Sequence, residues 1–179
     1  MTGPRVVLVG PMGAGKTTVA DLLAARWGLT AVDTDQLIES REGREIGDIF
    51  VDDGEAYFRG VERETVETAL RDHDGVLALG GGAVLDAGTQ TLLRGRRVVF
   101  LKVGLSDASR RVGLGSGRPL LLGNVRGRLK ALLDERMPVY TAVAELVVDT
   151  DGRTPEEVAE EVAAAVEAAE RTEAGPSDE

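Results

Sequence analysis

The sequence of 179 residues has no cysteine, one histidine and few aromatic residues (three Phe, two Tyr, one Trp). Without cysteine, disulfide bonds and thiolate catalysis are excluded. No apolar run approaches the ~20 residues that a membrane-spanning helix needs. The first residues also lack the basic, then apolar, then small-residue order of a signal peptide. These absences predict a cytoplasmic protein that has no membrane partner.

The formal net charge is −10, and the acidic residues are concentrated near the C-terminal end. Residues 156–179 hold nine acids and one arginine, which gives −8, whereas residues 1–155 hold 22 acids and 20 bases, which gives −2. An acidic balance argues against a nucleic-acid partner. It does not exclude small anionic ligands, because local arginines set the electrostatic field inside a cleft.

Residues 10–18 read GPMGAGKTT and match the phosphate-binding pattern G-x-x-x-x-G-K-[ST]. Before them, residues 5–9 form an apolar run that predicts a buried strand, and after them the apolar spacing of 18–27 predicts a helix. In this context backbone N–H groups and the helix dipole bind phosphate. We therefore expect Lys16 to reach the β- and γ-phosphates of a nucleotide and Thr17 to place its hydroxyl on Mg²⁺. The alternative is a glycine-rich turn with a surface lysine.

A second predicted strand, 30–33, ends in Asp33-Thr34-Asp35. Open α/β sheets bind ligands at the carboxyl ends of their strands, so these carboxylates are candidate site residues. Asp35 could equally be the N-cap of the next helix. A third predicted strand, 76–79, is followed by three glycines, at a position where phosphate-loop enzymes often carry a metal-organising aspartate. Asp33 is then the best candidate for the carboxylate on the metal side.

The region 43–70 is predicted to be helical, with a break at Gly54, and holds three of the six aromatic residues, Phe50, Tyr57 and Phe58. They are either ordinary packing or an apolar wall beside Arg59 for a small anionic ligand. Arg59 and Glu62 are three residues apart and can pair on one helix face. The alternative for that pair is a surface ion pair of little energetic value.

Strands are further predicted at 98–102 and 146–149, and the last helix is capped by Thr154 and Pro155. Residues 113–124 contain four glycines and Arg118, and predict either a flap that closes over phosphates or a loose surface loop. From 171 on, apolar periodicity is missing, which predicts a disordered tail. Five strands alternating with helices predict one α/β domain over 1–170, a three-layer sandwich with a parallel sheet and helices on both faces.

Several of these motifs together resemble the shikimate kinases, a nucleoside-monophosphate-kinase-like family of phosphate-loop enzymes. The resemblance runs from Arg5 to about Val162. The motifs besides the phosphate loop are Asp33-Thr34-Asp35, Asp53-Gly54-Glu55 with Phe58-Arg59, Gly80-Gly81-Gly82, Arg118-Pro119-Leu120, and Arg136 with Pro138 and Tyr140. The resemblance implies sheet order 2-3-1-4-5, an acceptor-binding region at about 35–61 and a lid at about 113–124. It also implies transfer of the γ-phosphate of ATP, with Mg²⁺, to the 3-hydroxyl of shikimate, on the pathway to chorismate and the aromatic amino acids.

The resemblance further implies a role for each matching residue. Asp35 would bind the acceptor hydroxyls and take the proton, and Arg118 would come down from the lid onto the phosphates; with Lys16 they form the catalytic set. The ATP-binding set is Gly13, Ala14, Gly15, Lys16, Thr17, Thr18, Arg111, Arg118, Arg153 and Pro155. The metal set is Thr17 and Asp33. The acceptor set is Asp35, Arg59, Gly80, Gly81, Gly82 and Arg136, in which the two arginines and a backbone N–H near Gly81 grip a carboxylate.

Two alternatives to this function remain at the level of sequence. One is another small-molecule kinase of the same group, acting on gluconate or a nucleotide. The other is a nucleotide-binding switch without turnover, although the guanine-reading pattern Asn-Lys-x-Asp is missing from the sequence. We expect the protein to act as a monomer with ATP and shikimate as its partners.

Overall fold

A computed structural model describes residues 3–115 and 124–175, and within these ranges the chain forms one parallel β-sheet. Its strands are β1 (Val6–Val9), β2 (Ala31–Asp33), β3 (Val76–Ala78), β4 (Val98–Lys102) and β5 (Leu146–Asp149). They lie in the order β2-β3-β1-β4-β5, and every pair of neighbours is parallel. The predicted α/β class and the sheet order 2-3-1-4-5 are confirmed.

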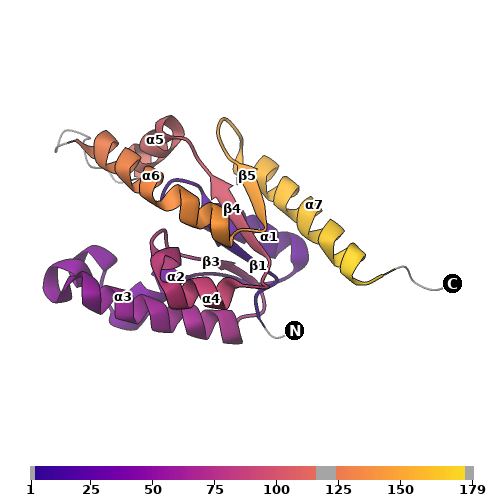
Figure 1. The fold of residues 1–179 in the computed structure, drawn as a ribbon, viewed down its shortest axis with the longest axis horizontal. Coiled ribbons are helices and arrows are strands. Elements are labelled where there is room, and N and C mark those ends of the chain that lie inside the picture. Colours follow the sequence, from indigo (N-terminus) through magenta and orange to yellow (C-terminus); the bar gives the residue numbers. More distant parts are fainter. Residues whose placement is uncertain (1–2, 116–123, 176–179) are drawn as a thin grey trace.

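The central strands are buried on both faces, as their continuous Val and Leu runs predict. On one face, the helices α1 (Lys16–Trp27), α5 (Leu105–Gly115) and α7 (Pro155–Glu173) pack on the sheet. On the other face lie α3 (Ile46–Asp72), α4 (Ala87–Leu93) and the end of α6 (Val125–Val143). These layers form the predicted three-layer sandwich, in which α3 and α4 lie on the opposite side of the sheet from α7 (Figure 1).

The predicted helix break at Gly54 is confirmed, because this residue, at φ 84° and ψ 170°, leaves helical geometry and divides α3 into two helical segments joined at a kink. A left-handed φ of this kind favours glycine. The helix α6, in contrast, continues past Pro138 to Val143, because the turn after the proline is buried in the core through Tyr140, which is 1% exposed. Tertiary packing here outweighs the local cost of proline.

The ends of two predicted segments also differ from expectation. Helix α5 includes Gly113 to Gly115, so the predicted flap does not begin at 113, and residues 116–123, with Arg118, lie outside the described residues. Helix α7 runs to Glu173 and therefore covers the first residues of the predicted disordered tail. Arg97 holds that helix end through Glu170 and Glu173. None of the described helices is long and apolar enough to cross a membrane.

The remaining elements are short and lead into the candidate site. Helix α2 (Thr34–Glu42) follows β2 directly, and a 3-10 helix η1 (Ala83–Leu85) follows the three glycines after β3. The carboxyl ends of β1, β2 and β3 are neighbours in the sheet, so the phosphate loop, the start of α2 and the glycines are brought to one edge.

Candidate functional site

The loop between β1 and α1 has the geometry of a phosphate cradle. Gly10, Gly13 and Gly15 have φ of 150°, 83° and 85°, which side chains other than glycine rarely adopt. A Cβ on Gly10 would lie 2.6 Å from the carbonyl oxygen of Leu101, so this position also needs glycine for space. Gly15 caps α1 and provides no side chain to the first helical turn, whose N–H groups are then available to an anion.

Lys16, the first residue of α1, lies inside this loop. Its Nζ donates to the carbonyl oxygens of Gly10 at 2.7 Å and Pro11 at 3.0 Å. Burial lowers the pKa of Lys16 to about 8, although the carboxylates of Asp35 and Asp33 favour the charged form. The ammonium group therefore lies against the backbone of the loop and close enough to Asp35 and Asp33 to interact with their carboxylates.

Thr17 and Asp33 are in direct contact. The Thr17 hydroxyl donates to Oδ2 of Asp33 at 2.6 Å, while Oδ1 accepts the N–H groups of Asp35 at 2.8 Å and Gln36 at 3.4 Å. The N-cap of α2 is therefore Asp33, and the alternative reading of Asp35 as that cap is wrong.

The Thr17 hydroxyl and the Asp33 carboxylate supply oxygen donors of the kind that Mg²⁺ prefers. No group of three or more His, Cys, Asp or Glu side chains suited to a metal is found within 3–115 and 124–175. A magnesium ion here would take its other ligands from phosphates and water, as Mg²⁺ usually does. The two residues fit such an ion, and that assignment stays a prediction.

Residues 80–82, which we call the glycine turn, face three candidate side chains from three helices. A Cβ on the first glycine would overlap the carboxylate of Asp35, and one on the third would lie 2.6 Å from Nη1 of Arg59. A Cβ on the second would lie 3.4 Å from Nη1 of Arg136. The missing side chains thus allow Asp35, Arg59 and Arg136 to meet around one turn, as the sequence predicts.

The surroundings of Asp35 raise the pKa of its carboxyl group. Burial, together with the nearby carboxylates of Asp33 and Glu62, raises the pKa of Asp35 to about 6, while Lys16 opposes the shift. A carboxyl group with a pKa near the working pH is suited to accept a proton.

Arg59 is held by a buried partner. Its Nη1 donates to Oε1 of Glu62 at 2.7 Å, and Glu62 is only 4% exposed. Burial raises the pKa of the Glu62 carboxyl, whereas the hydrogen bond from Arg59 lowers it. The alternative of a surface ion pair is therefore wrong, and a role for Glu62 in orienting Arg59 was missed at the level of sequence. The only signal for it is the three-residue spacing.

Ordinary packing, one of the two alternatives for the aromatic residues near Arg59, accounts for Phe50 and Phe58. Their ring centroids lie 4.7 Å apart, and both rings belong to a cluster with the buried residues Ile38, Ile49 and Val61. The guanidinium of Arg59 lies 5.3 Å from the Phe58 ring, so this ring also borders the arginine. Tyr57 is 43% exposed and donates to Glu42, so it does not belong to the cluster.

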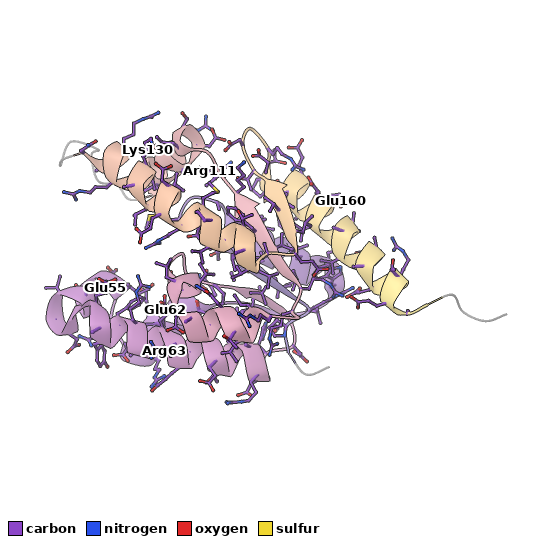
Figure 2. All side chains as sticks on the ribbon, in the orientation of Figure 1. Glu55, Glu62, Arg63, Arg111, Lys130 and Glu160 are labelled. Carbon is purple, nitrogen blue, oxygen red and sulfur yellow. The ribbon has the colours of Figure 1, made fainter. Side chains whose placement is uncertain are left out.

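Arg136 extends from α6 toward the glycine turn and has an unsatisfied donor. Its Nε is buried and has no hydrogen-bond partner among the described residues. A cavity of about 420 Å³ is lined by Arg136 together with Arg59, Glu62 and Gly82. Figure 2 shows Glu55 and Glu62 on the side of α3 that borders this cavity. A guanidinium whose buried Nε has no partner among the described residues, at the wall of a cavity, is suited to an anion.

Three residues of the predicted ATP-binding set, Arg111, Arg153 and Pro155, which the resemblance places beside the adenine, lie near β5. Arg111 donates to the carbonyl oxygen of Gly13 at 3.0 Å and to that of Thr150 at 2.8 Å, so it joins the phosphate loop to the loop after β5. Arg153 donates to Asp149 at 2.8 Å and pairs with Glu161 at 2.6 Å. Pro155 is the first residue of α7, whose cap Thr154 forms a capping box. The structure brings only Arg111 into contact with the phosphate loop.

Comparison with known proteins agrees with this geometry. A family model described as "Shikimate kinase" matches residues 12–167. A shikimate kinase of Streptomyces avermitilis is 56% identical over 167 residues, which cover 93% of this chain and 98% of that protein. The solved structure of a shikimate kinase from Acinetobacter baumannii in complex with shikimate is 33% identical, with a TM-score of 0.86 over 94% of this chain and 95% of that one.

A gluconokinase from Sinorhizobium meliloti is more distant, at 18% identity and a TM-score of 0.58 over 97% of each chain, and shares the fold alone. The family match covers most of the chain, and the identity to members of that family is high. The phosphate loop and the glycine turn agree with this match. The chain belongs to the shikimate kinase family of ATP-dependent kinases.

Proposed function

We propose that this chain transfers the γ-phosphate of ATP to the 3-hydroxyl of shikimate with the residues gathered at the carboxyl edge of its sheet. The observation that carries the proposal is the convergence of Asp35, Arg59 and Arg136 on the glycine turn, next to the phosphate loop. A planar carboxylate fits between two arginine side chains, which recognise it bidentately. A nucleoside monophosphate presents a tetrahedral phosphate and matches this arrangement less well. Gluconate also carries a carboxylate, and here the family match favours shikimate.

In the proposed mechanism the protein positions the reactants and stabilises charge. The phosphate loop and Lys16 bind the β- and γ-phosphates, where negative charge must be balanced during transfer. Mg²⁺, held through Thr17 and Asp33, would neutralise phosphate charge. Asp35 binds the acceptor hydroxyl and takes its proton, for which a pKa of about 6 is suitable.

Arg59 and Arg136 orient the acceptor from the opposite side. Glu62 keeps the Arg59 guanidinium in place through its buried hydrogen bond. The unpaired Nε of Arg136 gains a partner when a carboxylate enters. With both arginines on one carboxylate, the acceptor ring has a defined orientation relative to Asp35, which is the main contribution that a kinase makes to such a reaction.

Three further assignments belong to this proposal. By analogy with the family, Arg118 comes from the lid onto the transferred phosphate. By the same analogy, Arg153 and Pro155 border the adenine. The protein acts as a monomer, and light scattering of the purified protein would test this assignment. It works in the cytoplasm, which the lack of cysteine suits, and cell fractionation would test that.

The choice of acceptor is tested with shikimate and its methyl ester in the wild type, Arg59→Ala and Arg136→Ala. A charge-assisted hydrogen bond contributes about 1.5–3 kcal/mol, so each arginine should change acceptor affinity by roughly ten- to a hundredfold. The wild type should strongly prefer the acid, and both variants should lose most of that preference. Arg71→Ala is the control, because Arg71 is exposed and pairs only with its neighbour Asp72 among the described residues.

The same assay separates the proposal from its alternatives. If the wild type phosphorylates the ester as well as the acid, or prefers gluconate or a nucleoside monophosphate, the acceptor assignment fails while kinase activity remains. Turnover of ATP no faster than background hydrolysis with any acceptor would instead indicate a nucleotide-binding switch.

The metal assignment is tested by Asp33→Asn. Asparagine is as good an N-cap as aspartate, so the cap of α2 is kept while the charge is lost. We expect the Mg²⁺ concentration for half-maximal rate to rise several-fold. Asp33→Ala should show the same rise and in addition lose about 1 kcal/mol of stability with the cap. An Mg²⁺ titration unchanged in Asp33→Asn would assign the metal to other residues.

A further inference from the structure

Two buried hydroxyl groups hold the glycine turn, one from each side. The Thr34 hydroxyl oxygen accepts the N–H of Gly80 at 2.9 Å, and Thr34 is fully buried. The Tyr140 hydroxyl donates to the carbonyl oxygen of Gly81 at 2.6 Å, and Tyr140 is 1% exposed. A buried polar group that lost such a partner would be costly, so both contacts constrain the backbone of the turn.

Each hydroxyl belongs to a helix that carries one residue of the acceptor site. Thr34 directly precedes Asp35 at the start of α2. Tyr140 follows Arg136 by four residues on α6, so the two side chains lie on the same helix face. Because both helices are hydrogen-bonded to the same turn, the turn sets how far Asp35 and Arg136 lie from each other.

The hydrogen bonds of the turn leave two donors available. The carbonyl oxygens of Gly80 and Gly82 accept the N–H groups of Ala83 and Leu85, each at 3.1 Å. The N–H groups of Gly81 and Gly82 make no hydrogen bond with any described residue. These two donors lie beside Arg59 and Arg136, where a carboxylate would accept them.

Tyr140 is itself fixed by the core. Its ring lies against Phe100 of β4, with centroids 5.0 Å apart. Burial raises the pKa of the Tyr140 hydroxyl, which keeps it protonated and a donor at neutral pH. The position of the Gly81 carbonyl is therefore determined by the sheet through Phe100 and Tyr140.

We propose that Thr34 and Tyr140 are positioning residues for the acceptor, whose hydroxyls hold the glycine turn so that Asp35, Arg136 and the Gly81 N–H meet one shikimate molecule. This inference rests on the proposed function. Neither side chain contacts the acceptor in this proposal. Each is expected to affect acceptor binding specifically, and not only the stability of the fold.

The test uses Tyr140→Phe and Thr34→Val, which remove each hydroxyl and keep the shape. Loss of a neutral hydrogen bond of this kind should raise the KM for shikimate about three- to tenfold in each variant. The KM for ATP should stay within twofold of wild type, and the preference for the acid over its methyl ester should fall. Thr34→Ser keeps a hydroxyl and should restore both values.

The matched control is Thr65→Val, because Thr65 is also a buried hydroxyl but donates to the carbonyl oxygen of Val61 within α3. It should lower the melting temperature without the selective rise in KM.

If both test variants keep the wild-type KM for shikimate, or raise the KM for ATP by the same factor, the hydroxyls only stabilise the fold and the inference is wrong. If the wild type itself does not prefer the acid, the proposed carboxylate site fails first and this inference fails with it. The two variants act on different residues of the turn, Gly80 and Gly81, so either one decides the matter if the other does not fold.

Discussion

Lys16→Met is expected to lower turnover by more than about 100-fold and to leave the fold intact. The Nζ of Lys16 lies inside the phosphate loop, where it donates to the carbonyl oxygens of Gly10 and Pro11. Methionine has a similar length but no charge, so it removes a cation from the place where the transferred phosphate builds up negative charge. Buried ammonium groups are costly, so the variant should not be less stable than the wild type.

The measurement is a coupled assay of ATP turnover with and without shikimate, together with circular dichroism and thermal unfolding. Lys130→Met is the control, because Lys130 lies exposed on α6 and pairs with Asp134. It should retain wild-type turnover. Near wild-type turnover in a folded Lys16→Met would mean that the phosphate loop does not act on ATP.

The lowered pKa of Lys16 leads to a second readout of the same variant. At pH 8.5 a lysine whose pKa is about 8 is mostly neutral in the free protein. Phosphates beside it favour the charged form, so ATP binding should take up a proton at this pH. Calorimetry in buffers of different ionisation enthalpy should detect the uptake in the wild type and not in Lys16→Met.

Asp35→Asn is expected to lower turnover by about 10²–10⁴-fold, because asparagine keeps the shape of the side chain but cannot accept the proton. The effect on KM for shikimate should be smaller, since the amide still binds a hydroxyl. A loss of only a few-fold would mean that Asp35 positions the hydroxyl and does not take the proton, since a loose transition state asks little of a base.

The same substitution should stabilise the protein in the absence of ligands. The pKa of Asp35 is raised to about 6 in the folded protein, against about 3.9 in an unfolded chain. As the pH rises from 4 to 6, the unfolded chain loses this proton first, so the free energy of unfolding falls over that window and stays lower above it. Asp35→Asn removes that cost.

We expect the gain from Asp35→Asn to be about 1–3 kcal/mol near pH 7.5, which is several degrees in melting temperature for a chain of this size. At pH 4 most of the gain should vanish, because the folded protein then keeps the proton and about half of the unfolded chains keep it as well. The scans are made without Mg²⁺ and nucleotide. Asp21→Asn, at an exposed position of α1, is the control and should change neither turnover nor melting temperature. A melting temperature that falls in Asp35→Asn would mean that the carboxylate is structural.

Much of the fold could be predicted because it depends on local patterns. Continuous apolar runs at 98–102 and 146–149 correspond to β4 and β5 residue for residue. The phosphate loop combines a strand, glycines and a helix start within a few residues, so its geometry needs little from the rest of the chain. The strand order came from the resemblance, because periodicity shows which residues face a core but not which strands are neighbours.

The candidate site could be predicted as a set of residues but not as an arrangement. Arg59 and Arg136 lie 77 positions apart in the sequence, and only the folding of α3 and α6 around the glycine turn brings them together. The burial of Glu62 and the double role of Asp33 as cap and hydroxyl partner likewise depend on neighbours from other elements.

The sequence by itself determined the parallel α/β class, the phosphate loop and the residue types that a phosphate and a carboxylate require, because each follows from spacing along a strand, a turn or a helix. Only the tertiary structure decided that α6 continues through Pro138, that Tyr57 faces solvent, and that the hydroxyls of Thr34 and Tyr140 meet at one turn. These features are contacts between elements distant in sequence, and their free energy comes from burial and hydrogen bonds that form only when the sheet and its helices assemble.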